Sequence, residues 1–256
     1  MPAQAPLTQR ERLFYRDRLR EARYSALADA EGFAEVCFAL EALGMRLLRR
    51  EGTLSNYEPR IRTLSLEVPT LSKLAEDFPE FFTRFAALYD TVRRARNDAM
   101  HTGAYARHAT SAAIELCIGL EEAVMKGSLQ MSTVADFMVK TPVYVEPWQP
   151  VAHARQIMLT HSFSFLPVLH GNWKLLSEIS LVKFLQGSVD RRTALALSIE
   201  DAVARGLRLT DAPSVRTGDK IVDILQKEST QDSPAFWLVI DKNDRLAGIL
   251  SPFELM

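Results

Sequence analysis

Apolar residues recur at helical spacing through the first half of the chain. From Thr8 to Leu48 they return every three or four positions, as one buried face of an α-helix requires: Leu13, Phe14, Leu19, Ala22, Phe33, Val36, Leu40, Leu43 and Leu47. The other predicted features are a break at residues 30–32, a connector at 52–58, and helices over 71–100 and 109–126, with Pro69 and Pro79 at expected helix boundaries. This pattern is typical of a bundle of four or five helices.

The hydrophobic pattern changes after Gly127. Short runs rich in β-branched and aromatic residues alternate with short helical stretches, and these runs occupy residues 143–145, 165–169 and 236–240. Such alternation is typical of an α/β arrangement. The expected fold class is therefore multidomain: an N-terminal all-α helical bundle followed by an α/β (α+β) region, with the boundary near residues 128–132.

The α/β region contains an internal repeat. The matching pairs are residues 134–138 with 199–203, 145–151 with 215–221, and 166–175 with 237–246, the last without a gap. The same register places Ser180 opposite Ser251. The repeat therefore consists of two copies of about sixty residues, each with a helical start, strand, helix, strand, turn, strand and helix. One copy leaves an apolar sheet face that it cannot cover alone, so the copies are expected to pack together pseudo-symmetrically.

Each copy closes on a segment that resembles the closing motif of the CBS domain family. That motif has the form Gly-Ile-[Ile/Val]-[Ser/Thr]-x-x-Asp. The second copy has Gly-Ile-Leu-Ser-Pro-Phe-Glu at residues 248–254, and the first has the more divergent Ser-Glu-Ile-Ser-Leu-Val-Lys at 177–183. The resemblance predicts CBS-like repeats at residues 129–190 and 191–256, after a helical domain at residues 1–128.

The resemblance also implies a ligand site. In the family the closing acid accepts hydrogen bonds from a ribose diol, while the hydroxyl and the helix N-terminus favour phosphate. Carried over by position, Ser251 and Glu254 form one candidate site. Ser180 and Lys183 form a poorer one, because a lysine cannot accept a hydrogen bond from a ribose. The implied ligand is a regulatory adenine nucleotide (AMP, ADP or ATP) or a related adenosyl compound, with no cofactor required. The alternative is a pair that binds nothing and serves as a dimerisation scaffold.

The helical region carries one constellation with catalytic chemistry, in which Arg96 and Asn97 precede His101. Asn97 and His101 lie one helical turn apart and share a face. Histidine can act as general acid or base near neutral pH, and arginine can stabilise a phosphorane-like transition state. The motif resembles that of the HEPN family, Arg-x(4–6)-His, although Tyr105 falls four residues after the histidine rather than two. The alternative is a structural pair of Arg96 with His101 at a helix end.

Composition limits the kinds of binding partner, the kinds of cysteine site and the cellular compartment that are expected. The formal net charge of -1 argues against a strongly basic nucleic-acid binder without excluding a local basic patch. The two cysteines, Cys37 and Cys117, support neither a disulfide framework nor a structural zinc site, and no other metal-ligand spacing is found. No signal peptide or transmembrane run is recognised, so a cytoplasmic protein without a membrane partner is expected.

Two hypotheses follow for function. In the first, Arg96, Asn97 and His101 are the catalytic residues of a metal-independent endoribonuclease that acts on RNA as a homodimer, as the HEPN resemblance implies, and the CBS-like pair regulates it. In the second, the chain is a non-catalytic nucleotide-sensing or dimerisation scaffold that acts through a protein partner, such as an antitoxin. Whether the protein is an enzyme stays open at this point.

Overall fold

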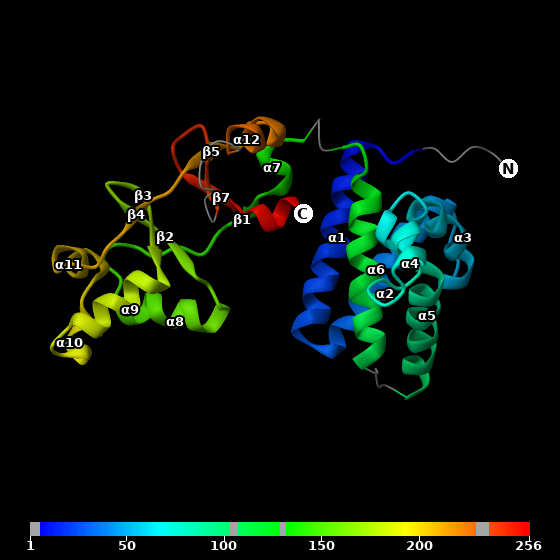
Figure 1. Ribbon diagram of the computed structural model, residues 1–256, viewed down its shortest axis with the longest axis horizontal. Coiled ribbons are helices and arrows are strands. Elements are labelled where there is room, and N and C mark those ends of the chain that lie inside the picture. The colour runs from blue at the N-terminus through cyan, green and yellow to red at the C-terminus, as the bar shows by residue number, and fades with distance from the viewer. Residues whose placement is uncertain (1–5, 103–106, 129–131, 229–235) are drawn as a thin grey trace. The chain divides into compact units, whose positions relative to one another are not determined.

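The computed structural model divides the chain into two compact units, residues 1–129 and 130–256 (Figure 1). It describes residues 6–102, 107–128, 132–228 and 236–256, although not the side chains of residues 30, 99–102, 107 and 227–228. The first unit is mostly helical, and the second mixes short helices with strands. The prediction of an N-terminal helical region followed by an α/β region is therefore confirmed.

Helices make up the first unit. Within the described residues they are α1 (Gln9–Ala28), α2 (Phe33–Leu48), α3 (Leu54–Ser65), α4 (Lys73–Asp77), α5 (Phe85–Thr102) and α6 (Arg107–Met125), with short 3-10 turns η1 (Ala30–Gly32) and η2 (Pro69–Leu71). The predicted break at residues 30–32 is confirmed by η1. Gly32 is required at this corner, because a Cβ there would lie 2.3 Å from the carbonyl carbon of Ser25.

One predicted boundary in this unit is wrong, and another is confirmed. The connector expected at residues 52–58 is mostly helical, because Thr53 and Asn56 form a capping box that starts α3. The helix boundary expected at Pro79 is confirmed, because the helical stretch predicted over residues 71–100 is interrupted between α4 and α5. Phe78 precedes Pro79, whose ring disfavours the α-conformation in the residue before it, and Phe78 has φ -133° and ψ 64°.

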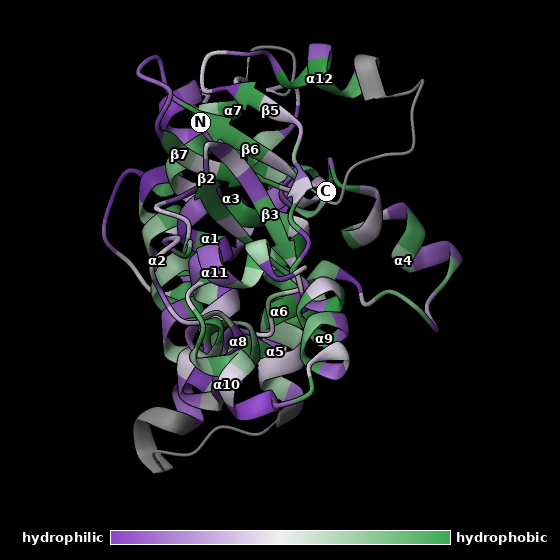
Figure 2. Cartoon of the chain, turned by 90° about the vertical axis from the view of Figure 1, so that its left-hand side faces the viewer, coloured by the Kyte–Doolittle hydropathy of each residue, from purple (hydrophilic) through white to green (hydrophobic). Residues whose placement is uncertain are grey.

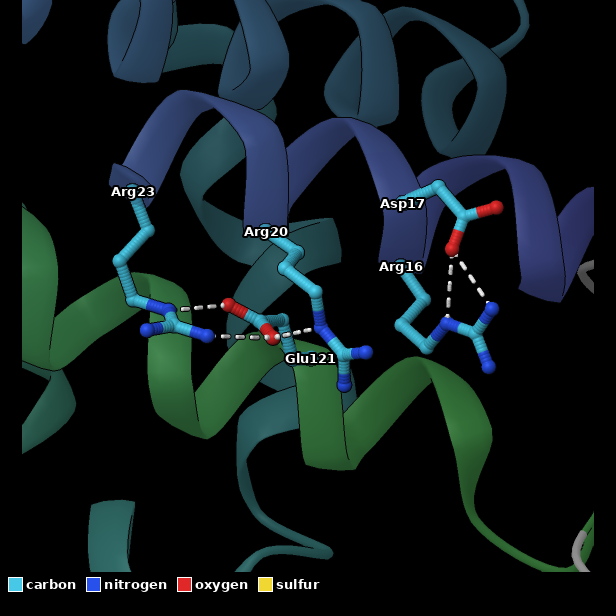
Figure 3. A network of polar contacts seen from close by, with 5 residues as sticks. All are labelled: Arg16, Asp17, Arg20, Arg23 and Glu121. Atoms are coloured by element: carbon cyan, nitrogen blue, oxygen red, sulfur yellow. Dashed lines mark hydrogen bonds and ion pairs between the residues drawn. The ribbon is translucent and has the colours of Figure 1, made fainter. Parts of the chain in front are cut away.

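A buried ion-pair network joins α1 to α6 (Figure 3). Glu121 accepts hydrogen bonds from Arg23 Nε at 2.7 Å and from Arg20 Nε at 3.2 Å. The exposed fraction of the side chain is 10% for both Glu121 and Arg23 and 16% for Arg20. Nearby, Arg12 Nη1 donates to the backbone oxygen of Val124 at 2.7 Å. These contacts hold α1 against the C-terminal half of α6.

The first turn of α1 makes the stability of this unit depend on pH. Glu11 accepts a hydrogen bond from Arg46 Nη2 at 2.9 Å and closes a capping box with Thr8. The arginine, followed by the Thr8 backbone, lowers the pKa of Glu11 from 4.5 to about 2. A carboxylate whose pKa falls on folding stabilises the folded state above its unfolded pKa, and that contribution is lost as the pH falls through its folded pKa.

We therefore expect Glu11→Gln to lower the free energy of unfolding by about 1 kcal/mol at pH 7. The difference in the free energy of unfolding between the variant and the unsubstituted protein should fall to zero between pH 4.5 and pH 2. This is the interval over which the Glu11 carboxylate becomes protonated. Urea titrations followed by circular dichroism at several pH values measure it. A difference that stays constant down to pH 2 would contradict the role given to this carboxylate.

The second unit contains two small sheets. Its described elements are α7 (Val134–Phe137), β1 (Val139–Lys140), α8 (Val151–His161), β2 (Phe165–His170), β3 (Asn172–Ser177), α9 (Glu178–Gly187), α10 (Arg191–Ala196), α11 (Ile199–Ala204), β4 (Thr210–Asp211), β5 (Ser214–Arg216), α12 (Ile221–Glu228), β6 (Trp237–Ile240), β7 (Leu246–Leu250) and the 3-10 turn η4 (Pro252–Leu255). One sheet has the strand order β1-β7-β6-β5, and the other has β2-β3-β4. β5 is parallel to β6, and the other named pairs are antiparallel.

The two copies of the repeat exchange their leading segments. β1 of the first copy pairs with β7 of the second, and β4 of the second copy pairs with β3 of the first. The backbone contacts at the starts of α7 and α11 are equivalent as well: Val134 N donates to Asp219 O at 2.9 Å, and Ile199 N donates to Gln149 O at 2.9 Å. Each copy is therefore completed by the other, as pseudo-symmetric packing requires.

Two apolar clusters stabilise this unit. The larger one lies under α8, α9 and α11 and includes the fully buried Val168, Leu176 and Ile199. The smaller one combines Leu175 of β3 with Leu238 and Ile240 of β6, so it joins one sheet to the other. Each cluster contains residues of both copies, so both depend on the packing of one copy against the other.

Candidate functional site

The two β-hairpins of the repeat differ in length, and this changes which residues are equivalent. Leu166 pairs with Leu176 ten positions later, whereas Trp237 pairs with Leu250 thirteen positions later. Leu166 and Trp237 are themselves an aligned pair, so Leu176 corresponds to Leu250. The alignment without a gap up to residue 246 is therefore wrong in the second strand of each hairpin, where it must shift by three residues.

The shift moves Ser177, rather than Ser180, to the position equivalent to Ser251. Ser177 is the last residue of β3, where it pairs with Phe165, and it is the N-cap of α9, with φ -91° and ψ 152°. Ser251 directly follows β7 and is the N-cap of η4, with φ -110° and ψ 157°. Ser180 then corresponds to Glu254, and Lys183 lies exposed one turn further along α9. The first copy thus has a hydroxyl where the second has a carboxylate.

The first candidate site is built on the N-terminus of α9. Ser177 Oγ accepts a hydrogen bond from Ser180 N at 3.1 Å and lies 2.9 Å from Ser180 Oγ. On the neighbouring strands, Lys174 Nζ lies 3.0 Å from the Asp211 carboxylate. The site combines two hydroxyls with the positive end of a helix dipole, which suits an anionic group better than a sugar diol.

The second candidate site lies where β7 ends. Ser251 and Glu254 are both half-buried, and Glu254 N donates to Ser251 O at 3.0 Å, which keeps the two residues on one turn. Ser251 makes no side-chain capping bond. A hydroxyl that can donate and a carboxylate that accepts, three positions apart on one turn, suit a vicinal diol.

Gly248 allows the leading strand of the first copy to approach this second site. β1 pairs with β7 so that Lys140 lies opposite Gly248. A Cβ at residue 248 would lie 2.7 Å from the backbone oxygen of Val139 and 2.9 Å from Met138 Sδ. The first glycine of the closing motif is therefore explained by the close approach of β1, a role that the sequence alone did not assign to it.

The predicted catalytic residues of the helical unit are only partly described. Arg96 Nη2 donates to Glu41 Oε1 at 2.8 Å, so α5 is ion-paired to α2. Asn97 is exposed. The backbone of His101 belongs to α5, but its side chain lies outside the described residues, as does the whole of Tyr105. The structure therefore gives Arg96 a structural partner, Glu41, that differs from the His101 considered from the sequence.

Both cysteines are free and buried. Burial raises the pKa of Cys37 to about 12, and burial raises the pKa of Cys117 as well. Neither thiol is therefore a ready nucleophile. The described part of the chain contains no cluster of three or more His, Cys, Asp or Glu side chains able to hold a metal ion.

Among the described helices, none combines the length and the apolar character needed to cross a membrane.

Comparison with known proteins bears on the second unit. The CBS domain family model matches residues 134–187. No curated protein sequence matches the chain. Solved structures that resemble it include a CBS domain-containing protein of unknown function from Bacillus anthracis, with 18% identity, 51% of this chain and 94% of that chain covered, and a TM-score of 0.41.

Two further similar structures have comparable values. A putative acetoin utilization protein from Vibrio cholerae has 20% identity, covers 48% of this chain and 87% of its own, and has a TM-score of 0.39. CBSX2, solved in complex with AMP, has 21% identity, covers 48% of this chain and 92% of its own, and has a TM-score of 0.36. These similarities are too distant to assign a ligand to this chain.

The family match coincides with one complete copy of the repeat. It begins at Val134, the first residue of α7, and ends at Gly187, the last residue of α9. It therefore includes the first candidate site at Ser177 and Ser180, while Ser251 and Glu254 lie in the second copy. Residues 134–187 form a CBS domain.

Proposed function

We propose that the second unit is a sensor for a small adenine-containing ligand, an adenine nucleotide or a related adenosyl compound. The observation that carries the proposal is the CBS domain at residues 134–187, joined by reciprocal strand exchange to a second copy that presents its own hydroxyl and acid. The ligand is regulatory, because neither candidate site contains a nucleophile or general base paired as catalysis would require.

The two candidate sites lie at the ends of strands in different sheets and suit different chemical groups of such a ligand. Glu254 accepts hydrogen bonds from the ribose hydroxyls, and Ser251 contributes a hydroxyl beside it. Ser177 and Ser180 offer hydroxyls at the N-terminus of α9, where an anionic phosphate is favoured. Lys183 is exposed beyond this group and contributes at most long-range attraction. We therefore expect nucleosides to bind at the second site alone, and phosphorylated ligands to bind at either site.

Calorimetric titration of the full chain with adenosine, AMP and ATP tests this division. We expect Glu254→Gln to weaken adenosine and AMP alike by about tenfold, because a charge-assisted acceptor is lost. Ser177→Ala with Ser180→Ala should weaken AMP and ATP but not adenosine. Asp223→Asn, an exposed carboxylate on α12, is the matched control and should bind like the unsubstituted protein. Absence of binding by the unsubstituted protein at millimolar ligand would refute the proposal.

The ribonuclease hypothesis stays a prediction. Arg96 would have to leave Glu41, 2.8 Å away, before its guanidinium could contact a phosphate. RNA cleavage without added metal, compared with His101→Ala, decides it. The homodimer also stays a prediction.

A scaffold that passes the ligand signal to a protein partner needs no catalytic residue. We therefore infer that this scaffold function is better supported than the ribonuclease function.

A further inference from the structure

The turn after α4 exposes two aromatic rings to solvent. Phe81 is 75% exposed and Phe78 is 46% exposed, and every residue from Glu76 to Phe81 is exposed. Figure 2 shows α4 at the edge of the helical unit, with its following turn projecting outward. Contact of this much aromatic surface with water is unfavourable, and such patches commonly mark interaction sites. We call residues 76–81 the aromatic turn.

The aromatic turn is anchored at both ends. Phe78 N donates to Leu74 O at 2.8 Å, and Phe81 N donates back to Phe78 O at 3.1 Å. Beyond the turn, Thr83 N donates to Glu115 Oε1 on α6 at 2.7 Å. The rings are therefore presented by a turn that hydrogen bonds already hold in one conformation. A partner that binds there does not have to pay the conformational entropy of ordering the turn.

Three carboxylates flank the two rings in the sequence. Glu76, Asp77 and Glu80 lie within the aromatic turn, are exposed, and form no ion pair with another described residue. The basic residues of the segment, Lys73 and Arg84, lie outside these six positions. An apolar centre with a charged rim is the usual anatomy of a protein interface. Here the rim is acidic.

We propose that the aromatic turn docks a basic, amphipathic segment of a protein partner. Apolar side chains of that segment cover Phe78 and Phe81, and its Lys or Arg residues pair with Glu76, Asp77 and Glu80. A second copy of this chain fits less well, because a two-fold contact through the same turn would set carboxylates against carboxylates. The site lies in the helical unit and does not rest on ligand binding by the second unit.

A defined peptide tests the chemistry. The probe is a labelled helical peptide of about 14 residues with leucine on one face and lysine on the other, and its comparison has glutamate in place of lysine. Anisotropy titrations of the full chain should show binding of the lysine peptide and at least about tenfold weaker binding of the glutamate peptide. Equal binding of the two peptides would overturn the proposal.

Variants then locate the binding. Phe78→Ser with Phe81→Ser should weaken the lysine peptide by about tenfold or more, because the apolar anchors are lost. Glu76→Gln, Asp77→Asn and Glu80→Gln together should weaken it comparably and reduce its salt dependence. Phe38→Ser is the matched control, since Phe38 is 52% exposed on α2. The proposal fails if the turn variants bind like the unsubstituted protein, or if Phe38→Ser is equally impaired.

Cysteine labelling shows whether the aromatic turn is accessible in the whole protein. Cys37 and Cys117 are buried, so a thiol introduced by Phe81→Cys reacts with little background. Its rate with a small disulfide reagent should be within about threefold of that of Val189→Cys, a fully exposed reference position. A rate more than about tenfold slower would mean that the rest of the chain, or a second copy, already covers the turn, and would overturn the proposal. AMP titration of the Phe78 and Phe81 double variant keeps this result separate from that of the ligand proposal.

Discussion

Replacing Glu121 with glutamine should lower the free energy of unfolding of the helical unit by about 3–5 kcal/mol. The carboxylate is buried between α1 and α6, with Arg23 Nε at 2.7 Å and Arg20 Nε at 3.2 Å (Figure 3). Glutamine keeps the shape of the side chain but removes its charge. Arg23, whose side chain is only 10% exposed, then loses its counter-ion where water barely reaches it. The cost comes from this desolvated arginine more than from the hydrogen bonds lost.

The distribution of tryptophan allows the two units to be followed separately. Trp148, Trp173 and Trp237 all lie in the second unit, whereas most of the helix lies in the first. In a urea titration we expect Glu121→Gln to shift the transition seen by far-ultraviolet circular dichroism and to leave the tryptophan transition in place.

An exposed ion pair provides the control for Glu121. Glu58 lies 2.6 Å from Arg62 one turn along α3, with 30% of the Glu58 side chain and 49% of the Arg62 side chain exposed. Glu58→Gln should therefore cost about 0.5 kcal/mol or less. If the Glu121 and Glu58 variants shifted the transition by the same small amount, burial of the network would not be what stabilises α1 against α6.

Periodicity and proline signals together predicted most of the helical unit. Pro79 was expected to mark a helix boundary, and α4 ends just before it. The prediction failed at the connector, where Thr53 and Asn56 start a helix in a polar stretch. The capping signal is visible in the sequence, and at this place it determines the structure.

The strand register of the second unit could not be predicted from the sequence repeat, for a different reason. The repeat identified the segments that pair, but not that the second hairpin is three residues longer than the first. One extra residue lies at a register shift between Val239 and Ile240. The rest lies in a turn where Asp241 Oδ1 accepts from Asn243 N at 2.7 Å and from Arg245 N at 2.9 Å. Apolar residues on both sides match in either register, so only the strand pairing shows that Ser177 is the counterpart of Ser251.

Contacts between distant segments were beyond prediction from one sequence. Glu41 lies 55 positions before its partner Arg96, and no spacing rule connects them. The same holds for Gly248, whose neighbours Met138 and Val139 lie more than a hundred positions earlier in the chain. In both cases the role of the residue depends on a neighbour that is distant in the sequence and that only the folded structure brings into contact.

Replacing Gly248 with valine should remove ligand binding at the second site and destabilise the second unit by about 2–3 kcal/mol. The new Cβ would lie 2.7 Å from the backbone oxygen of Val139, and a backbone atom in a paired strand cannot move away as a flexible side chain can. β1 must therefore separate from β7. Ser251 and Glu254 follow directly on β7, so their positions change with the strand.

Tryptophan fluorescence during urea unfolding measures the loss of stability, and AMP titration measures the loss of binding. Gly218→Val is the matched control, because a Cβ at residue 218 meets no atom within 4 Å. We expect its unfolding midpoint and its AMP affinity to equal those of the unsubstituted protein. If the two valine variants unfold at the same urea concentration, β1 does not depend on the space that Gly248 leaves. If Gly248→Val is destabilised but still binds AMP, the ligand site does not lie at the end of β7. Stability and affinity falling together would place the ligand beside the strand that the first copy contributes to the second.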